Sequence, residues 1–302
     1  MKNIWGIDLG GSKIECAVLN SENHEVISRN RVPTESANGY EHVLSQIKKL
    51  VELSSSEINE KPGKIGMGTP GSIDPITGYL KNSNSTILNE KPFKIDIQNV
   101  LGIPVEIAND ANCFALAETL MGVVPEQCPD ARVVFGVIMG TGVGGGLVVN
   151  GQVWNGKHGI GGEWGHIYLD ESGGSCYCGK SGCVETIISG SSLERYYFEE
   201  SGNSKKLKEI TLDHLNGSDS YSTKTIQRLL YFFGLGLSNI INIIDPDVIV
   251  IGGGVGNLEL LYSNGPEEVE KHVFNNSFST PILKPTLGDS AGVYGAAFLT
   301  QS

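Results

Sequence analysis

The stretch that decides the fold is IWGIDLGGSKIECAVLN, residues 4–20, because its pattern returns in VVFGVIMGTGVGGGLVVN, residues 133–150. Residues 4–20 align without a gap on residues 134–150, and Gly10 falls on Gly140. Each copy is typical of a strand, a glycine turn and a second strand. Glycines in such turns permit positive φ and carry no Cβ that would obstruct a phosphate approaching the backbone N–H groups.

The repeat predicts two related half-structures that face each other across a cleft, each offering amides to a polyphosphate. The alternative is two ordinary hairpins with glycine-rich turns. Neither copy contains GxxxxGK[ST], and neither has the strand-to-helix context that a dinucleotide-binding GxGxxG requires. The sequence therefore indicates a phosphate site of another kind.

Composition argues against two classes of protein. Lys and Arg number 22 against 34 Asp and Glu, a net charge of −12, and no basic run is long enough to follow a nucleic-acid backbone. No apolar stretch approaches the ~18 residues that span a bilayer, and the first residues do not resemble a signal sequence. We therefore expect a cytoplasmic protein with neither a nucleic-acid nor a membrane partner.

Strand-like and helix-like segments alternate along the 302 residues, which predicts a mixed α/β fold of two lobes. We place an N-terminal small lobe at residues 1–121 and a C-terminal large lobe at 122–302. The last helix, which begins near Gly292, is expected to pack back on the N-terminal lobe. The predicted helices cover residues 39–53, 109–120 and 225–244. The polar stretch at 74–92 predicts a long loop, and loops of that length in compact domains are usually functional or disordered.

Nucleotide binding is predicted at three glycine-rich places. The first is the loop of Asp8, Gly10, Gly11, Ser12 and Lys13, where a carboxylate at a strand end can hold Mg²⁺ and orient a phosphate. The second is Gly140, Thr141 and Gly142 in the repeated loop. The third is Gly253 and Gly254, after the apolar run VIVIG, which form a shelf for the adenosine of ATP.

Asn109 and Asp110 stand where the predicted strand PVEIA gives way to a helix. The helix dipole favours a negative charge at that position, so we expect Asp110 to be ionised. Such a carboxylate suits a catalytic base that accepts a sugar hydroxyl's proton during phosphoryl transfer. The alternative is that both residues only cap the helix.

A dense cluster of metal-binding residues follows the second repeat. His166, Cys176, Cys178 and Cys183 can complete a tetrahedral Cys₃His zinc site without an open position, so the metal is expected to be structural. Because CxC is rarer than CxxC in such sites, unmetallated buried thiols are the alternative. Glu163 and Glu185 flank the cluster and suit acceptors for vicinal sugar hydroxyls, unless they are ordinary surface charges.

These residues resemble the ROK family of sugar kinases and repressors. GTGVGGGL through GGEWGH follows the family signature, CYCGKSGC matches its zinc cluster, and the similarity runs from GIDLGGSK to GDSAGVYGAAFL. The resemblance implies the actin-like, hexokinase/ribonuclease-H-like two-lobed fold with a duplicated core and an inter-lobe cleft. It also implies a homodimer.

By position, the resemblance makes Asp110 the catalytic base. Sugar ligands are implied at Asn109, Asp110, Glu163, His166 and Glu185, to which we add Gly71 and Asn84 from the turn and loop that precede them. The implied cofactors are ATP, Mg²⁺ and structural Zn²⁺. Ser12 stands where the family usually has Thr, which keeps the hydroxyl.

The favoured activity is ATP-dependent phosphorylation of fructose, with mannose as a further substrate, because SIDPITGYLKNSNST is similar to fructokinases. NDANCFALAE and GTGVGGGLVVNG are similar to N-acetylglucosamine kinases, so an N-acetylglucosamine, N-acetylmannosamine or glucose kinase is the alternative. A non-catalytic sugar-responsive ROK regulator is an alternative of a different class, although it needs a DNA-binding helix-turn-helix and this sequence opens directly on the Ile4 strand.

Overall fold

The computed structural model describes residues 3–301, and the chain forms two compact units. Unit 1 consists of Met1–Asp130, Gly146–Gly162 and Thr286–Ser302, and unit 2 consists of Ala131–Gly145 and Glu163–Pro285. These bounds differ from the predicted division at residues 121 and 122, because the chain returns to unit 1 twice after it first leaves it. A single boundary along the sequence therefore cannot separate the two units.

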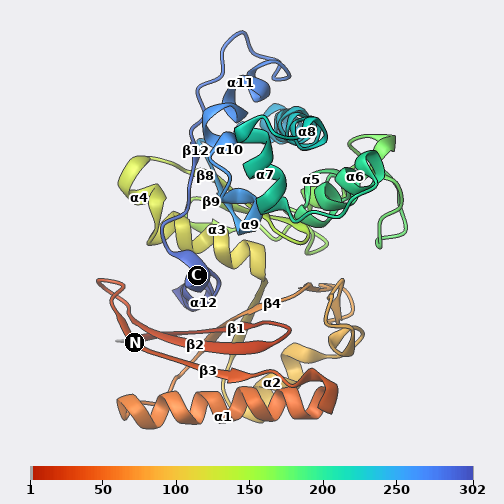
Figure 1. Ribbon diagram of the computed structural model, residues 1–302. Coiled ribbons are helices and arrows are strands. Elements are labelled where there is room, and N and C mark those ends of the chain that lie inside the picture. The colour runs from red at the N-terminus through yellow and green to blue at the C-terminus, as the bar shows by residue number, and fades with distance from the viewer. Residues whose placement is uncertain (1–2, 302) are drawn as a thin grey trace. The chain divides into compact units, whose positions relative to one another are not determined.

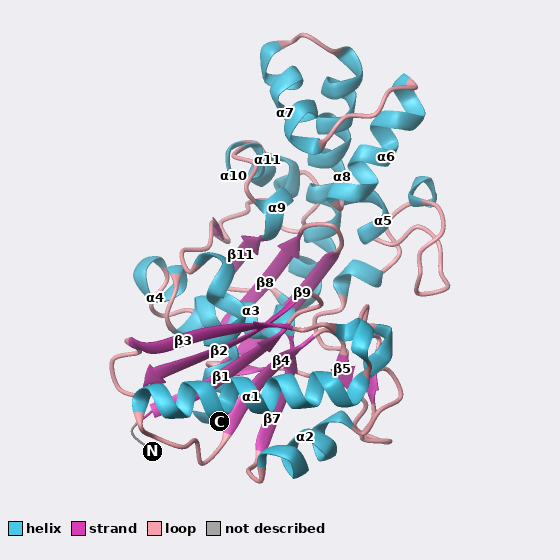
Figure 2. Cartoon of the chain, turned by 60° about the horizontal axis from the view of Figure 1, so that its bottom comes forward, coloured by secondary structure: helices cyan, strands magenta, loops and turns pink. Residues whose placement is uncertain are grey.

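A five-stranded sheet with the order β3-β2-β1-β4-β7 forms the centre of unit 1 (Figure 2). Its strands are β1 (Asn3–Leu9), β2 (Lys13–Asn20), β3 (Val26–Pro33), β4 (Ile65–Thr69) and β7 (Val105–Asn109). The first three are antiparallel neighbours, whereas β4 lies parallel to both β1 and β7. Asp8 pairs with Gly68 and Thr69 with Asn109, so the carboxyl ends of three parallel strands meet at one edge.

Helices pack on this sheet and bury its apolar side chains. α1 (Tyr40–Ile58) lies along β2 and β3, as Figure 1 shows, and α12 (Ala291–Phe298) packs on β1, β4 and α3 (Asp110–Leu120). Ile7 and Met67 are completely buried, and burying an apolar side chain of this size contributes about 1.5–3 kcal/mol. α12 lies so near the sheet that a Cβ at Gly6 would stand 2.2 Å from the Val293 carbonyl oxygen.

The remaining elements of unit 1 are short. They are β5 (Ser72–Ile73), β6 (Leu80–Lys81), α2 (Phe93–Leu101), α4 (Val123–Gln127), β10 (Gln152–Val153) and the 3₁₀ turns Ser36–Asn38, Thr86–Leu88, Gly288–Ser290 and Leu299–Gln301. Most of the predicted long loop at residues 74–92 is indeed irregular, although it contains β6 and one of these turns.

The second sheet has the order β10-β9-β8-β11-β12. β8 (Val133–Met139), β11 (Val248–Gly252) and β12 (Ile282–Leu283) are parallel neighbours in unit 2, and β9 (Val143–Val149) begins there. Both copies of the repeat therefore form the predicted strand, turn and strand. The helices of unit 2 are α5 (Glu185–Ile188), α6 (Gly190–Ser201), α7 (Leu207–Asn216), α8 (Ser220–Ile244), α9 (Gly253–Gly256), α10 (Leu260–Ser263) and α11 (Gly265–Glu270), with 3₁₀ turns at Trp164–His166 and Glu171–Gly173.

α8 organises the helical part of unit 2, because α6, α7 and α11 all pack against it (Figure 2). It begins at Ser220, earlier than the predicted Thr225, since the Asp219 side chain caps it by accepting from the Tyr221 N–H. Among the described residues, no helix is both long and apolar enough to cross a membrane.

Candidate functional site

The first phosphate loop is the tight turn between β1 and β2. The Gly10 N–H donates to the Lys13 carbonyl oxygen at 3.0 Å, which closes the turn, while Gly11 and Ser12 are exposed. Lys13 forms an ion pair of 3.8 Å with the buried Glu15. The loop therefore presents accessible glycine amides next to the end of β1, where Asp8 lies.

Asp8 is enclosed by glycines from two neighbouring elements. A Cβ at Gly68 of β4 would stand 3.4 Å from Asp8 Oδ1, and one at Gly292 of α12 would stand 3.4 Å from its Cγ. Burial, with a further contribution from the nearby Asp110 carboxylate, raises the pKa of Asp8 from 3.8 to about 6. Two carboxylates that repel each other in a poorly hydrated place suit a divalent cation, whose ligands are hard oxygens.

Asn109 and Asp110 form the junction of β7 and α3. Both side chains accept from the Ala111 N–H, at 2.9 Å for Asn109 and 2.8 Å for Asp110, and Asn109 Nδ2 donates to the Gly71 carbonyl oxygen at 3.4 Å. Asn109 is therefore the helix cap, and the structure brings the predicted Gly71 beside it.

Burial opposes the effect of the helix dipole on the Asp110 carboxylate. The side chain keeps an exposed surface, yet dense protein around its carboxylate raises its pKa, and this burial outweighs the hydrogen bonds that lower it. The net pKa shift is therefore opposite to the effect of the helix dipole, and the ionisation of Asp110 stays a prediction. A carboxylate with a raised pKa is a better proton acceptor, as general base catalysis requires.

Asn84 lies on an exposed part of the loop between β6 and the Thr86–Leu88 turn. The same loop approaches the first phosphate loop, because a Cβ at Gly11 would meet the Ser85 Oγ at 3.8 Å. Asn89 accepts from the Ser83 N–H at 2.9 Å and so holds the loop in shape. In unit 1 the structure thus gathers the predicted residues from three separate parts of the chain.

The second phosphate loop lines a cavity of about 920 Å³ within unit 2. Gly140 and Thr141 are joined there by Gly254 and by the start of α6. The Gly190 N–H donates to the Gly140 carbonyl oxygen at 2.8 Å, and the Ser191 Oγ donates to that of Thr141 at 2.7 Å. Gly253 has a φ of +86° and a Cβ on it would stand 2.3 Å from the Met139 carbonyl oxygen, so the turn requires glycine.

The opposite wall of this cavity comes from α7, which was not predicted from the sequence. Its lining residues include Leu207, Thr211, Leu212 and Leu215, and two of these leucines are exposed by more than half. A cavity with glycine amides on one side and leucines on the other suits a nucleotide, whose phosphates need donors and whose base needs apolar contact.

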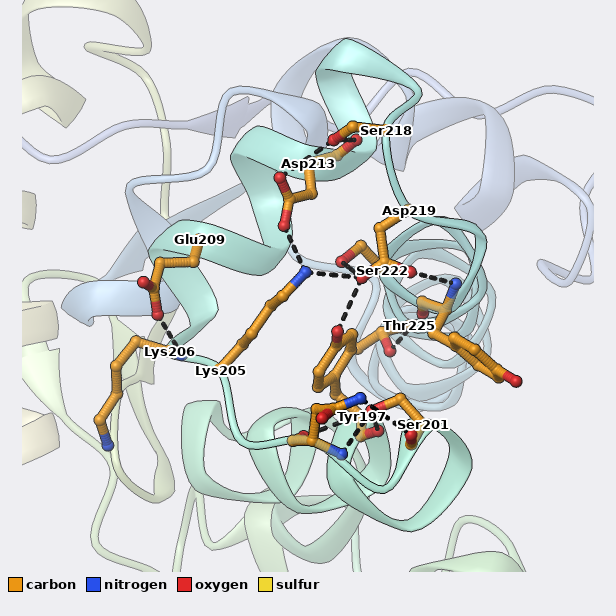
Figure 3. Close-up of polar contacts among 12 residues, drawn as sticks. Tyr197, Ser201, Lys205, Lys206, Glu209, Asp213, Ser218, Asp219, Ser222 and Thr225 are labelled. Carbon is orange, nitrogen blue, oxygen red and sulfur yellow. Dashed lines mark hydrogen bonds and ion pairs between the residues drawn. The ribbon is translucent and has the colours of Figure 1, made fainter.

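A cluster of polar side chains holds α7 in place (Figure 3). Lys205, just before α7, donates to Asp213 on the helix at 2.6 Å and to Asp219 at the start of α8 at 2.7 Å. The Tyr197 hydroxyl of α6 donates to the same Asp219 carboxylate at 2.7 Å. Because Asp219 accepts both bonds, three helices are joined at one point, and the α7 wall is tied to its neighbours.

The four predicted metal ligands lie together in unit 2. One ligand atom from each of His166, Cys176, Cys178 and Cys183 lies within 4.8 Å of all the others. The Cys178 and Cys183 sulfurs are 3.6 Å apart, as are Cys176 Sγ and His166 Nδ1. Four ligands at about 2.3 Å around one zinc ion are separated by roughly 3.8 Å, so the donor set fits this metal.

Glu185, at the start of α5, connects this cluster to the second phosphate loop. Its Oε2 accepts from the Val143 N–H at 2.9 Å, and a Cβ at Gly142 would stand 2.4 Å from the same oxygen. Glu163 immediately precedes the turn that carries His166. Burial raises the pKa of the Tyr177 hydroxyl to about 12, with further contributions from the charges of Glu185 and Glu163.

Known proteins are similar to this chain over nearly its whole length. The family described as ROK matches residues 4–302. The N-acetyl-D-glucosamine kinase of Vibrio atlanticus is 35% identical over 305 residues, covering 98% of both chains. A ROK hexokinase structure from Thermus thermophilus has a TM-score of 0.87 at 30% identity, covering 98% of this chain and 96% of that one. A ROK glucokinase from Streptomyces griseus in complex with glucose and AMPPNP has a TM-score of 0.77 at 26% identity, covering 99% and 100%.

Proposed function

Because the chain belongs to the ROK family, we propose that it transfers a phosphoryl group from ATP to N-acetyl-D-glucosamine. The observation that carries this proposal is the similarity to kinases named for that sugar, at 35% identity across nearly the whole of both chains. This similarity supports the alternative prediction of an N-acetylglucosamine kinase better than the fructose preference that residues 72–86 indicate. Fructose therefore becomes a competitor to be tested.

Three coarser predictions are confirmed. The ROK family match covers almost the whole chain, and a solved ROK hexokinase superposes over 98% of it, which confirms both the family and the actin-like α/β fold class. The predicted enzyme class, an ATP-dependent sugar kinase, is confirmed by the kinases among the relatives and solved structures. A homodimer and a cytoplasmic location stay predictions.

Asp110 is the proposed catalytic base. A sugar hydroxyl is too weak an acid to ionise before attack, so its proton moves to Asp110 late, as the bond from its oxygen to the γ-phosphorus forms and the bond from that phosphorus to ADP breaks. The raised pKa of Asp110 favours that transfer. We propose that Asn109 and Gly71 orient the same sugar, because Asn109 donates a hydrogen bond to the Gly71 carbonyl oxygen. Asn84, on the loop that follows, is proposed as a further sugar ligand.

ATP is proposed to bind in the cavity between the second phosphate loop and α7. The amides of Gly140, Thr141 and Gly254 face the phosphates, and the leucines of α7 contact the base. Asp8 and the amides of the first phosphate loop act on the transferring group. Mg²⁺, which the Asp8 carboxylate fits, supplies positive charge for the phosphates.

Zinc is the proposed occupant of the His166, Cys176, Cys178 and Cys183 cluster, where the ligand spacing supports it. Its role is structural, because all four positions are taken by protein ligands. The cluster holds the segments that carry Glu163 and Glu185, whose carboxylates are proposed to accept hydrogen bonds from sugar hydroxyls.

A coupled ADP-release screen tests this proposal. N-acetylglucosamine, N-acetylmannosamine, glucose, mannose and fructose are each supplied with ATP and Mg²⁺, and ADP is compared with a sugar-free control. We expect the highest kcat/KM with N-acetylglucosamine. If none of the five sugars raises ADP release above that of the sugar-free control, the result favours a non-catalytic sugar-responsive regulator. A higher kcat/KM with fructose would instead support the substrate that residues 72–86 indicate.

A further inference from the structure

We propose that Glu194 makes the ATP site selective for ribonucleotides, because its carboxylate accepts a hydrogen bond from a hydroxyl group of the ribose. This inference rests on the proposed function, since it names the part of ATP that the residue recognises. Glu194 belongs to α6 and lines the cavity of about 920 Å³ in unit 2, together with the second phosphate loop and α7.

The start of α6 fixes the distance of Glu194 from the phosphate loop. The Gly190 N–H donates to the Gly140 carbonyl oxygen at 2.8 Å, and the Ser191 Oγ donates to that of Thr141 at 2.7 Å, so the first residues of the helix are held against the loop. Glu194 follows Ser191 by about one helical turn. Its backbone is therefore about one turn away from the amides that are proposed to face the phosphates.

The Glu194 side chain reaches the opposite wall of the cavity at the first residue of α7. Its Oε1 accepts from the Leu207 N–H at 3.1 Å. Leu212 and Leu215, which are proposed to contact the base, lie about one and a half and two turns farther along the helix. Along the cavity, the carboxylate thus comes after the phosphate loop and before these leucines. In a nucleotide the ribose joins the phosphates to the base, so the ribose is the part that meets Glu194.

The chemistry of a carboxylate favours the same part of the nucleotide. A carboxylate accepts hydrogen bonds and donates none. Phosphate oxygens also accept and carry negative charge, so a carboxylate repels them. The ribose is uncharged and carries hydroxyl donors, and a hydrogen bond from a hydroxyl to a charged acceptor is stronger than one between neutral groups.

The second oxygen of the Glu194 carboxylate is accessible to a ligand. Oε2 lies 2.9 Å from the Nζ of Lys206, whose side chain is 80% exposed. An ion pair with so exposed a lysine contributes little to stability, and a carboxylate oxygen has more than one lone pair, so this contact does not block the site. The Glu194 side chain itself is 29% exposed and stands on the cavity wall.

Nucleotides that lack one ribose hydroxyl test the inference. Calorimetric titration of the full chain, with Mg²⁺ and without sugar, gives Kd for ATP, 2′-deoxy-ATP and 3′-deoxy-ATP. For the wild type we expect at least one deoxynucleotide to bind about 10-fold more weakly than ATP, the effect of one hydrogen bond to a charged group. Glu194→Ala is expected to lower this ratio of Kd values to less than about twofold. Glu194→Gln, which keeps an acceptor for the Leu207 N–H, is expected to give an intermediate ratio.

The ratio reports on the ribose, because a displaced α7 would weaken the binding of all three nucleotides alike. Glu199→Gln is the matched control and is expected to keep the wild-type ratio. Glu199 is 60% exposed on the same helix, and its ion pair with Arg195, at 3.7 Å, involves no described residue of the cavity wall.

The outcomes separate this inference from the proposed function. If the wild type binds all three nucleotides equally, or if Glu194→Ala leaves the ratio unchanged, the assignment of Glu194 is overturned while the proposed ATP site stands. If the wild type binds none of the three nucleotides, the proposed ATP site is contradicted, and the role of Glu194 is refuted with it.

Discussion

Replacing Gly142 with alanine is predicted to weaken sugar binding through Glu185 while the fold stays intact. A Cβ at this position would stand 2.4 Å from Glu185 Oε2 and 3.3 Å from its Cδ. Real contacts of this kind are essentially never below 3.0 Å, so the carboxylate must move by about 0.6 Å or more. That movement also breaks its 2.9 Å hydrogen bond from the Val143 N–H.

The expected rise in KM for the sugar follows from the hydrogen bond between the sugar and the Glu185 carboxylate, which the movement misaligns. A hydrogen bond to a charged group contributes about 1.5–3 kcal/mol, which corresponds to roughly a 10- to 150-fold rise in KM for the sugar. The atom in the way is the end of a flexible side chain, so stability is expected to fall by only about 1 kcal/mol, or ~2 °C in Tm. KM for ATP is expected to change much less than KM for the sugar.

A double-mutant cycle provides the assay. Gly142→Ala is made in the wild-type chain and in Glu185→Ala, and KM for N-acetylglucosamine and for ATP is measured by coupled ADP release with all four proteins. Without the carboxylate the added methyl group displaces nothing, so the second substitution is expected to have little effect in the Glu185→Ala background. Equal losses in both backgrounds, or a larger rise in KM for ATP, would refute the reasoning.

Three further predictions concern the two carboxylates and the metal. Asp110→Asn is expected to lower kcat by ~10²–10⁴ with little change in either KM, and near-normal turnover of the purified variant would exclude Asp110 as the base. Asp8 has a pKa of about 6 in the folded chain and 3.8 when exposed, so between these two pH values the folded state binds more protons than the unfolded state. The unfolding free energy of the metal-free protein is therefore expected to fall as the pH rises from about 3.8 to about 6. Asp8→Asn should flatten this part of the denaturant-derived stability curve, and a curve as steep as that of the wild type would contradict the shift. Elemental analysis is expected to give one zinc ion per chain, and Cys178→Ala should lower zinc content, Tm and sugar affinity together; full activity of a zinc-free protein would argue against the site.

Local pattern was enough to find much of the fold and of the candidate site. The two strand–turn–strand copies, the Asp8 position at a strand end and the Cys178 neighbourhood are all features of short stretches whose glycine or cysteine spacing limits what they can form. The structure places each of these stretches as expected within its own unit. The roles of the individual residues stay predictions until the variants are measured.

Tertiary packing determined what the sequence could not show. The spacing of Leu212 and Leu215 also occurs in ordinary surface helices, so the sequence does not reveal that they line a cavity. The structure shows that α7 forms a wall of this cavity and that the polar cluster around Lys205 holds the helix there (Figure 3). The pKa of Asp110 is raised by burial, which depends on how the folded chain packs, whereas the helix dipole is a local effect. The two returns of the chain to unit 1 are likewise invisible in composition.

A comparison of two sugars on the same protein decides whether N-acetyl-D-glucosamine is the substrate. The kcat/KM values for N-acetyl-D-glucosamine and for fructose are measured on one preparation at saturating ATP and Mg²⁺, with ADP and sugar phosphate quantified together. The account predicts a clearly higher value for N-acetyl-D-glucosamine, with one ADP formed per sugar phosphate. A higher value for fructose would contradict the proposed substrate.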